Sequence, residues 1–349
     1  MQAVILAAGR GSRLHPITLN RSKAMLPILG KPIIARVMES IAANGIRDFV
    51  IVISPEDHEI TGYFQHESSL GKSQVSSGAG SHACDSGAWK SPRQRICDES
   101  SLDVEVRFVI QPERKGAADA LRWAAPLIQG EFIQSACDNL VSAEEIGHML
   151  DLWRAEPRPN ALLSLIKVAP EDIPKIGLTA FDGTWVTRIV EKPRPEEAFS
   201  NIASMPLYCF NQHILEYLHE VPLSPRGEYE LQSAIQMLIE RRGRVRGVIV
   251  PSRLTLTTAA DLLAINRHFL LSAKNKPQIA AQAVGPESHL VPPLYIEDGV
   301  SIGAECVIGP NVYIERECKI GDNVRLRNAV VLCAAVVASG SAIDGEILS

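Results

Sequence analysis

The chain has 349 residues, 46% of them hydrophobic, and a formal net charge of -5 at pH 7, which allows two domains with a sizeable core and indicates neither a nucleic-acid nor a membrane partner. No run approaches the roughly 18 uninterrupted apolar residues of a membrane span, and the N-terminus lacks the basic and apolar regions of a signal peptide. The seven cysteines are scattered without a Cys-x-x-Cys pair, which predicts free thiols in a cytoplasmic protein rather than a zinc site.

Apolar runs alternate with segments of helical period over the first three quarters of the chain. The predicted strands are 3–7, 49–54, 104–110, 132–136, 161–168 and 245–250, and the predicted helices are 33–43, 117–125, 143–154, 230–241 and 258–271. This alternation predicts an α/β, Rossmann-like fold, in which helices cover both faces of a mostly parallel sheet. Ligands bind such sheets at the carboxyl ends of the strands. We therefore expect the loop after the first strand to lie at the same edge as Asp138, which follows a later strand.

Residues 68–101 break this alternation because they are rich in serine and glycine. Such a composition is typical of a long flexible loop inserted between two elements. A role as a lid or as a partner-binding segment is the alternative.

An aliphatic residue recurs every six positions near the C-terminus, and a small or β-branched residue lies four positions after each one. The aliphatic positions are Ile296, Ile302, Ile308, Ile314, Ile320, Leu326, Leu332 and Ala338; the second set is Val300, Cys306, Val312, Cys318, Val324, Val330, Val336 and Ala342. A six-residue repeat is typical of a β-helix, whose stacked coils bury a continuous aliphatic column. We expect all eight positions of each set to keep one phase.

This repeat resembles the left-handed β-helix of many acyltransferases and of the tails of sugar-nucleotide enzymes. Acyltransferases of this fold use a histidine on the solenoid as general base, whereas the last histidine here is His289, before the first predicted coil. We therefore expect a structural tail over residues 285–349 that supports a homo-oligomer, with acyl transfer as the alternative. The preceding domain is expected to cover residues 1–275.

Residues 6–27 read LAAGRGSRLHPITLNRSKAMLP, a loop with two glycines and the cations Arg10, Arg13, Arg21 and Lys23. Glycines after a first strand let backbone N–H groups approach phosphates closely. A Walker loop requires Gly-Lys-Ser/Thr, and a dinucleotide fingerprint requires a third glycine where Leu14 stands, so neither fits. A tight turn with solvated arginines is the simplest alternative.

The stretch closely resembles the signature of the sugar-1-phosphate nucleotidylyltransferases at residues 6–16, Lys23 and Pro27. The segments QPERKGAADAL, CDN and EKP follow in the family's order and spacing. The resemblance implies an enzyme that uses Mg²⁺ to make an NDP-sugar and pyrophosphate from an NTP and a sugar 1-phosphate. The layout looks most like long-form glucose-1-phosphate thymidylyltransferases, which favours dTTP or UTP with glucose 1-phosphate or a relative. Enzymes that make UDP-N-acetylglucosamine or GDP-mannose share the layout.

The resemblance also implies a role for individual residues. Arg13 and Lys23 would be catalytic, because a bidentate guanidinium and an ammonium suit the triphosphate. Asp138 would bind the metal, since a hard cation prefers carboxylate oxygen. The nucleotide would contact Leu6, Ala8, Gly9, Gly11, Ser12, Gln111 and Gly116; the sugar phosphate would contact Asn139, Gly177, Glu191, Lys192 and Asn201. Ordinary loop, capping and solvated strand-end roles are the alternatives for these residues.

One position departs from the family. Aligned on Asp261 and Leu262, the family's second metal aspartate becomes Thr255, which brings no charge. Magnesium can still bind through Asp138, nucleotide phosphates and water. This departure leaves open a catalytically silent relative that binds an NDP-sugar and regulates a partner.

Overall fold

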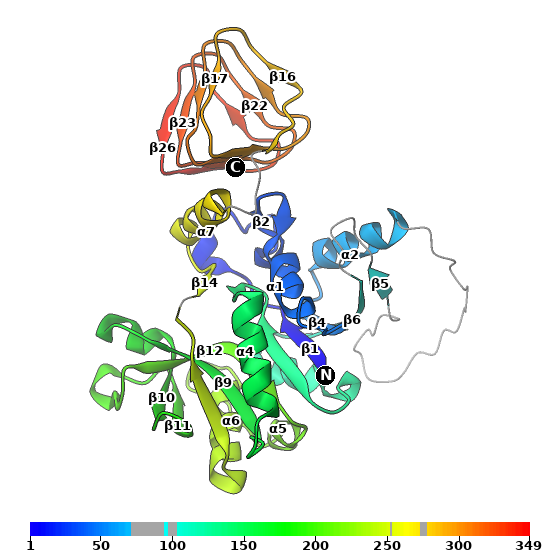
Figure 1. Cartoon of the computed structure of the whole chain (residues 1–349), viewed down its shortest axis with the longest axis vertical. Coiled ribbons are helices and arrows are strands. Elements are labelled where there is room, and N and C mark those ends of the chain that lie inside the picture. The colour runs from blue at the N-terminus through cyan, green and yellow to red at the C-terminus, as the bar shows by residue number, and fades with distance from the viewer. Residues whose placement is uncertain (71–93, 97–102, 252, 273–277) are drawn as a thin grey trace. The chain divides into compact units, whose positions relative to one another are not determined.

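The computed structural model describes residues 1–70, 94–96, 103–251, 253–272 and 278–349 (Figure 1). The chain divides into two compact units, which we call the sheet unit (Met1–Arg10 and Val37–Arg253) and the solenoid unit (Gly11–Arg36 and Leu254–Ser349). The boundary between the two units falls inside helix α1 (Ile33–Ala42): Arg36 is the last residue of the solenoid unit's first segment, and Val37 belongs to the sheet unit.

Four neighbouring parallel strands form the centre of the sheet unit, in the order β7 (Phe132–Ala136), β1 (Gln2–Leu6), β4 (Asp48–Ile53) and β6 (Val104–Ile110). Leu6 is opposite both Val52 and Ala136, and Ile53 is opposite Ile110. The carboxyl ends of these strands therefore lie at one edge of the sheet. This confirms the prediction that the loop after the first strand and Asp138 share an edge.

The remaining strands make the sheet mixed. They are β5 (Gln94–Ile96), β9 (Ala161–Lys167), β10 (Gly177–Phe181), β11 (Val186–Glu191), β12 (Ile202–Phe210) and β13 (Val245–Ile249). Strand β12 is antiparallel to both β7 and β9, and β13 is parallel to β9. Strands β10 and β11 form a hairpin beside β12, and β5 is antiparallel to β6. The α/β class is as predicted, whereas β10, β11 and β12 were not anticipated.

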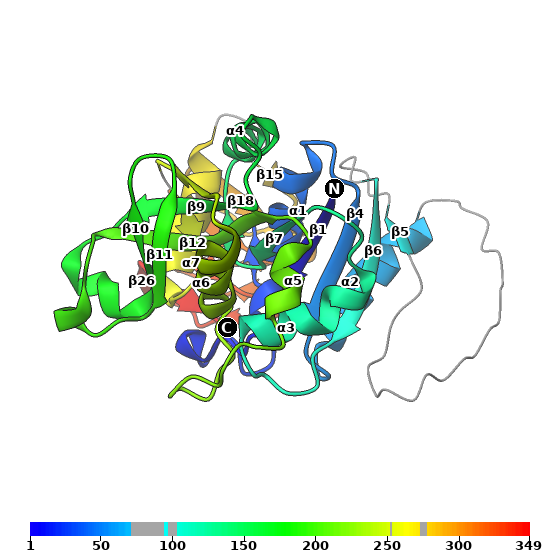
Figure 2. The same ribbon diagram turned by 90° about the horizontal axis from the view of Figure 1, so that it is seen from below.

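Helices cover both faces of this sheet, as expected: α3, α5 and α6 lie on one face and α4 on the other (Figure 2). Their bounds are α2 (His58–Leu70), α3 (Ala117–Ala124), α4 (Ala143–Arg154), α5 (His213–Tyr217) and α6 (Leu231–Arg242). Helix α4 begins with a capping box, in which Ser142 and Glu145 satisfy each other's backbone N–H groups. Of the predicted insertion at 68–101, only the end of α2 and strand β5 fall within the described residues.

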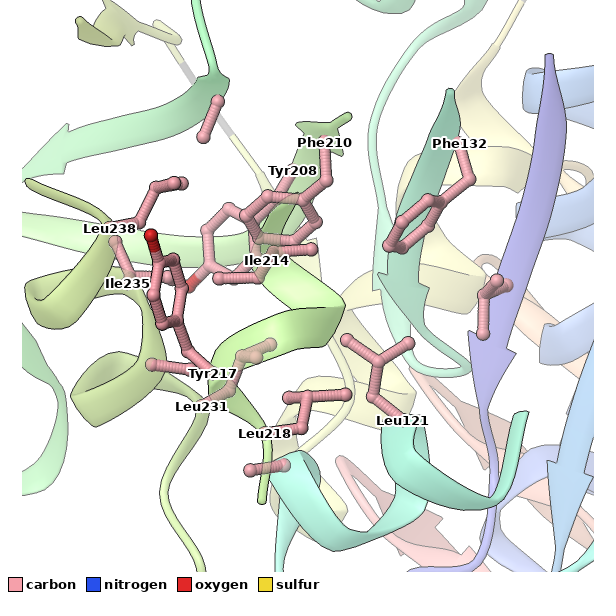
Figure 3. Packing of buried hydrophobic residues seen from close by; sticks show 14 of the residues in the cluster. Leu121, Phe132, Tyr208, Phe210, Ile214, Tyr217, Leu218, Leu231, Ile235 and Leu238 are labelled. Atoms are coloured by element: carbon pink, nitrogen blue, oxygen red, sulfur yellow. The ribbon is translucent and has the colours of Figure 1, made fainter. Parts of the chain in front are cut away.

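The sheet unit has an apolar core between the sheet and helices α3, α5 and α6 (Figure 3). Phe132 on β7 and Phe210 on β12 pack with their ring centroids 5.6 Å apart. Leu121 of α3 and Leu238 of α6 are fully buried in the same cluster. This packing fixes the strands whose ends carry the predicted binding segments.

The solenoid unit contains a three-sided parallel β-helix, consistent with the left-handed form that the sequence predicts. The first side is β15 (Gln278–Ile279), β18 (Leu294–Ile296), β21 (Val312–Ile314), β24 (Val330–Val331) and β27 (Ile347–Leu348); the second is β16 (Ala283–Val284), β19 (Ser301–Ile302), β22 (Lys319–Ile320) and β25 (Val336–Val337); the third is β17 (His289–Leu290), β20 (Val307–Ile308), β23 (Arg325–Arg327) and β26 (Ala342–Asp344). The first coil thus begins at Gln278, before the six-residue repeat that the sequence shows from Ile296.

The predicted phase of the repeat is wrong after Leu326. Ile296 is opposite Ile314, but Ile314 is opposite Val331 and not Leu332, so this coil is one residue shorter than the one before it. Because side chains alternate along a strand, a shift of one residue exchanges the inward and outward sets. Val331 lies in the solenoid's apolar interior, whereas Leu332 packs in a separate cluster.

The same shift changes the next coil face. Val337, not Ala338, belongs to the interior cluster, and Ala338 is exposed. Ala335 replaces Val336 in that cluster, and Val336 is 75% exposed. Likewise Ala329 and not Val330 is interior, and Ala342 is exposed.

Two other segments pack within the solenoid unit. Helix α7 (Ala259–Leu271) begins with a capping box formed by Thr258 and Asp261. Leu270 of α7 and Leu29 share a buried cluster with Tyr313 and Leu332 of the β-helix. Residues 11–36 therefore fold with the solenoid although they are far from it in sequence.

Candidate active site

The loop after β1 is fixed at its start by an arginine that the sequence did not single out. Arg114 Nε donates to the Ala8 carbonyl at 2.8 Å, and its Nη2 donates to Ser54 Oγ at 3.0 Å and Glu56 Oε2 at 2.8 Å. Gly9 follows with an exposed backbone and open space around its Cα. The only sequence signal for Arg114 was its place inside QPERKG. Leu6 lies at the end of β1 and is partly buried.

The second half of the loop belongs to the solenoid unit. Gly11 has φ +65°, and a Cβ there would come within 2.9 Å of Lys23 Cβ, so only glycine fits. Its carbonyl accepts hydrogen bonds from Leu14 N at 2.8 Å and Thr18 Oγ1 at 2.9 Å.

The predicted phosphate-binding side chains begin two short 3₁₀ turns. Ser12 and Arg13 are exposed in the turn Ser12–Leu14, and Lys23 is half-buried at the start of the turn Lys23–Met25. Arg10 and Arg13 are thus both exposed in this loop, and the Lys23 side chain packs against Gly11.

Gln111 follows β6 with its side-chain amide in a fixed orientation. Its Nε2 donates to Asp119 Oδ2 at 2.8 Å and to the Gly116 carbonyl at 3.2 Å, and the residue is 3% exposed. Both partners only accept, so the NH₂ group must face them. The amide carbonyl of Gln111 is the atom left to accept a hydrogen bond from a ligand.

Gly116 precedes helix α3 in a conformation that only glycine adopts easily. It has φ +97°, and a Cβ would lie 2.6 Å from the Tyr229 carbonyl oxygen. The backbones are tied there, because Tyr229 N donates to the Lys115 carbonyl at 2.7 Å and Ala118 N donates to the Tyr229 carbonyl at 3.0 Å. Gly116 therefore allows a second chain segment to approach the predicted base-binding loop.

Asp138 and Asn139 follow β7 at the same edge as Gly9 and Gln111. Asp138 is half-buried, whereas Asn139 is only 2% exposed. Neither the Nδ2 nor the Oδ1 atom of Asn139 has a hydrogen-bond partner among the residues that the structure describes. An unsatisfied buried amide is costly, so this side chain is suited to a ligand or water.

The residues at this position fit a magnesium ion that takes most of its ligands from outside the protein. No group of three or more histidine, cysteine, aspartate or glutamate residues that could hold a metal occurs within the described ranges. Asp138 supplies a carboxylate, and Asn139 supplies an amide oxygen with no protein partner there. Mg²⁺ is commonly held by one or two carboxylates together with substrate phosphates and water.

A glycine and a glutamate face each other at the predicted sugar site. Gly177 on β10 is opposite Glu191 on β11, and a Cβ at Gly177 would lie 2.9 Å from Glu191 Oε2. Lys192 has a left-handed φ of 45°, and its Nζ lies 3.6 Å from Glu191 Oε1. Strand β11 therefore ends with a carboxylate and an ammonium side by side.

The Glu191 carboxyl is poised to titrate near neutrality. Burial raises its pKa from 4.5 to about 7; Lys192 opposes the rise and the nearby Glu230 adds to it. Its Oε2 is buried and has no hydrogen-bond partner in the described part of the chain. Perturbed carboxyl groups with an unsatisfied oxygen are common at functional sites.

Two further polar residues adjoin this pair and were missed from the sequence. The Tyr208 hydroxyl donates to Ser204 Oγ at 3.2 Å, and a Cβ at Gly177 would lie 2.8 Å from that same Oγ. Asn201 is exposed directly before β12, and over the described residues no hydrogen bond joins its side chain to Glu191. The structure brings Gly177, Glu191 and Lys192 together but leaves Asn201 without such a contact.

Comparison with known proteins agrees with the fold. A family model described as "Nucleotidyl transferase" matches residues 2–251. The chain belongs to the nucleotidyl transferase family. This membership confirms the predicted resemblance. A second model, described as the GMPPB C-terminal domain, matches residues 290–349.

Curated relatives align over much of the chain. A glucose-1-phosphate thymidylyltransferase from Streptomyces griseus is 27% identical over 89% of this chain and 77% of its own length. The UTP–glucose-1-phosphate uridylyltransferase AglF from Haloferax volcanii is 29% identical over 70% of this chain and 85% of its own length. The bifunctional protein GlmU from Methanococcus maripaludis is 28% identical over 77% of this chain but only 54% of its own length. The chain thus spans about half the length of that relative.

A solved structure shares the fold. The structure of a UDP-glucose pyrophosphorylase complexed with UDP-glucose matches with a TM-score of 0.62 and 21% identity, covering 77% of this chain and 97% of that one. In the described part of the present chain, no helix is both long and apolar enough to span a membrane.

Proposed function

We propose that the protein is a sugar-1-phosphate nucleotidylyltransferase, which makes an NDP-sugar and pyrophosphate from an NTP and a sugar 1-phosphate. One observation carries this proposal: three predicted binding segments leave the same edge of one parallel block of strands. These are Gly9 after β1, Gln111 after β6 and Asp138 after β7. Parallel α/β sheets bind their ligands at this edge.

In the proposed reaction, a phosphate oxygen of the sugar 1-phosphate attacks the α-phosphorus of the NTP and expels pyrophosphate. The protein needs to orient two anions and neutralise their charge, and it needs no nucleophile of its own. Arg13 and Lys23 would bind the triphosphate, and Lys192 would bind the phosphate of the sugar. Asp138 and Asn139 would hold Mg²⁺, which supplies further charge neutralisation when bound.

The orientation of Gln111 supports a choice of nucleobase. Its free amide carbonyl can accept a hydrogen bond from the ring N–H of a base. Uracil, thymine and guanine have a ring N–H on their pairing edge, whereas cytosine and adenine have a ring acceptor there and offer only an exocyclic amino group as donor. We propose that Gln111 reads the ring position. The names of the relatives favour UTP or dTTP with glucose 1-phosphate. UDP-N-acetylglucosamine and GDP-mannose remain products compatible with this layout.

The sugar itself would contact Glu191, which can accept hydrogen bonds from two hydroxyls. Gly177 lets strand β10 pack closely beside that carboxylate, because a Cβ there would lie 2.9 Å from Oε2. We also propose that Asn201 contacts the sugar, which requires its side chain to move when the substrate binds.

The direct test measures pyrophosphate release with magnesium, crossing five NTPs with glucose, N-acetylglucosamine and mannose 1-phosphates. We expect one preferred pair containing UTP or dTTP. Lys23→Ala is expected to lose activity while keeping the circular dichroism spectrum of the wild type. Lys175→Ala is the matched control, because Lys175 pairs only with the exposed Asp172 in the described structure and should leave activity unchanged. Full activity in Lys23→Ala would contradict the assignment.

A second candidate function is a silent homologue that binds an NDP-sugar and regulates a partner. Thr255 favours it, because its hydroxyl is buried without a hydrogen-bond partner among the described residues and carries no charge for a metal. This function predicts UDP-glucose binding without pyrophosphate release. Thr255→Asp would then be expected to raise turnover.

We further propose that the protein is cytoplasmic, since its scattered cysteines are typical of free thiols, and that its solenoid tail supports a homo-oligomer. Light scattering coupled to gel filtration would give a mass above that of the 38.0 kDa chain. A monomeric mass at micromolar concentration would contradict this part of the proposal.

A further inference from the structure

The segment that carries Lys23, residues 21–30, is held at its first end by the β-helix. Arg21 Nη1 lies 2.8 Å from Glu315 Oε2, and the two side chains are only 22% and 7% exposed. Glu315 directly follows β21, and the same Oε2 accepts a hydrogen bond from Cys333 N on the next coil at 2.8 Å. The carboxylate is therefore fixed by the solenoid before it meets Arg21.

The other end of the 21–30 segment is held at the turn between β2 (Pro27–Ile28) and β3 (Lys31–Pro32). The buried amide of Asn266 on α7 accepts from Leu29 N at 3.1 Å and donates to the Pro27 carbonyl at 3.2 Å. Gly30 N donates to the Tyr313 hydroxyl at 3.2 Å, and that hydroxyl donates to the Glu297 carboxylate.

Between these two ends the segment has little rigidity of its own. Lys23 begins a single 3₁₀ turn, closed by a hydrogen bond from Leu26 N to the Lys23 carbonyl at 3.2 Å. Short turns of this kind do not hold a position without tertiary contacts. The side chains of Ala24 and Leu26 are buried, so apolar packing also helps to hold the segment in place.

We propose that Glu315 and Tyr313 of the β-helix are positioning residues for Lys23, so that the solenoid is a working part of the phosphate-binding machinery. This inference rests on the proposed function for the role of Lys23. Glu315 acts through Arg21, which it neutralises and anchors, and Tyr313 acts through Gly30. The tail then has a role within one chain, separate from any role in oligomerisation.

The test is Glu315→Gln, which keeps the size of the side chain and an acceptor for Cys333 N but removes the charge that faces Arg21. We expect kcat to fall between about tenfold and a hundredfold, because small misplacements of a catalytic group have effects of this size. The KM for sugar 1-phosphate should not change. In a Lys23→Ala background the same substitution should lower the residual kcat by a smaller factor than in the wild type, because both changes act on one group.

The matched control is Asp344→Asn on the same solenoid. It removes a carboxylate paired with Arg327, but these side chains are 60% and 48% exposed and do not contact the 21–30 segment in the described structure. We expect its kcat to stay within about twofold of the wild type. Tyr313→Phe is the second variant, used if Glu315→Gln does not fold, and removes only the hydroxyl that Gly30 N contacts.

Amide hydrogen exchange over residues 21–30 gives a readout that does not depend on activity. Glu315→Gln should raise exchange in this segment, and Asp344→Asn should not. If the wild type released no pyrophosphate, the proposed function would fail, while exchange would still report on the anchoring. Equal kcat and equal exchange in Glu315→Gln and the wild type would overturn the inference. So would a decrease in kcat from Glu315→Gln that is as large in the Lys23→Ala background as in the wild type.

Discussion

Gly177 and Glu191 are opposite each other in the β10–β11 ladder, and a single methyl group on Gly177 would lie 2.9 Å from Glu191 Oε2. Under the proposed function, this carboxylate contacts the sugar, and glycine at position 177 lets the backbone of β10 pack against it. The same methyl group would lie 2.8 Å from Ser204 Oγ.

Gly177→Ala should therefore weaken sugar binding. We expect the KM for sugar 1-phosphate to rise about tenfold or more, because Glu191 and Ser204 must both move to accept the methyl group. The KM for the NTP should change little. Gly183→Ala on the adjoining turn is not a suitable control because of its φ of +107°, whereas Gly62→Ala meets open space in helix α2 and should be neutral. An unchanged sugar KM in Gly177→Ala would place the sugar elsewhere.

The raised pKa of Glu191 predicts a pH dependence of stability. As pH rises from 4.5, the unfolded state loses the proton of this carboxyl first, while the folded state keeps it up to about pH 7. The free energy of unfolding should therefore fall over this window, by on the order of 3 kcal/mol, and then level off. Glu191→Gln should remove this fall. The free energy of unfolding of the variant, relative to that of the wild type, should therefore rise between pH 5 and pH 8.

Urea unfolding at a series of pH values measures this effect. Glu196→Gln is the control, because Glu196 is 66% exposed and pairs with the exposed Arg194. Parallel pH profiles for Glu191→Gln and the wild type would show that the carboxyl is not held in an unfavourable environment.

Asp119 should act on nucleotide choice through Gln111. Asp119→Asn can offer an NH₂ group to Gln111, which allows the Gln111 amide to turn and present a donor instead of its carbonyl. We expect the preference for UTP or dTTP over CTP to fall by a factor of about 10 to 100, in line with one mismatched buried hydrogen bond. Competition between UTP and CTP for the same sugar 1-phosphate measures it. If Asp119→Asn kept the full preference for UTP or dTTP over CTP, the Gln111 amide would not select the base.

The shifted phase of the solenoid predicts opposite outcomes for two adjacent valines. Val337 is buried in the interior and Val336 is 75% exposed. Val337→Asp should lower the free energy of unfolding by about 3 kcal/mol or more, because it buries a carboxylate in an apolar column. Val336→Asp should cost less than about 1 kcal/mol. An unbroken six-residue phase predicts the reverse order, which thermal unfolding of the two variants would reveal.

Strong periodicity made much of the fold predictable from sequence. The apolar run at the start of the chain and the amphipathic segment of α4 gave elements whose type and place agree with the structure. Strand β12 was missed because Pro206 lies near its middle and lacks the N–H that a central strand needs. The ladder between β12 and β9 shifts between Ser204 and Tyr208, which accommodates the proline. The short coil after Leu326 was missed because valine repeats at adjacent positions hide a one-residue deletion.

The candidate site was predictable where residues lie close in sequence and was not predictable where distant segments meet. Gly116 was recognised from its motif, but the reason that only glycine fits is the backbone of Tyr229, far along the chain. Arg114 contacts Ala8, Ser54 and Glu56, which lie in other segments, so its place inside QPERKG did not reveal its role. The anchoring of Arg21 by Glu315 joins residues from opposite ends of the chain, which no local spacing rule reveals.

The measurement that tests nucleotidyl transfer most directly is ³¹P NMR of the protein with magnesium, UTP or dTTP, and glucose 1-phosphate. We predict that the signals of the triphosphate decrease while the coupled pair of an NDP-sugar and the signal of free pyrophosphate appear together. Unchanged spectra from folded protein that binds UDP-glucose would contradict the account and would favour a silent relative.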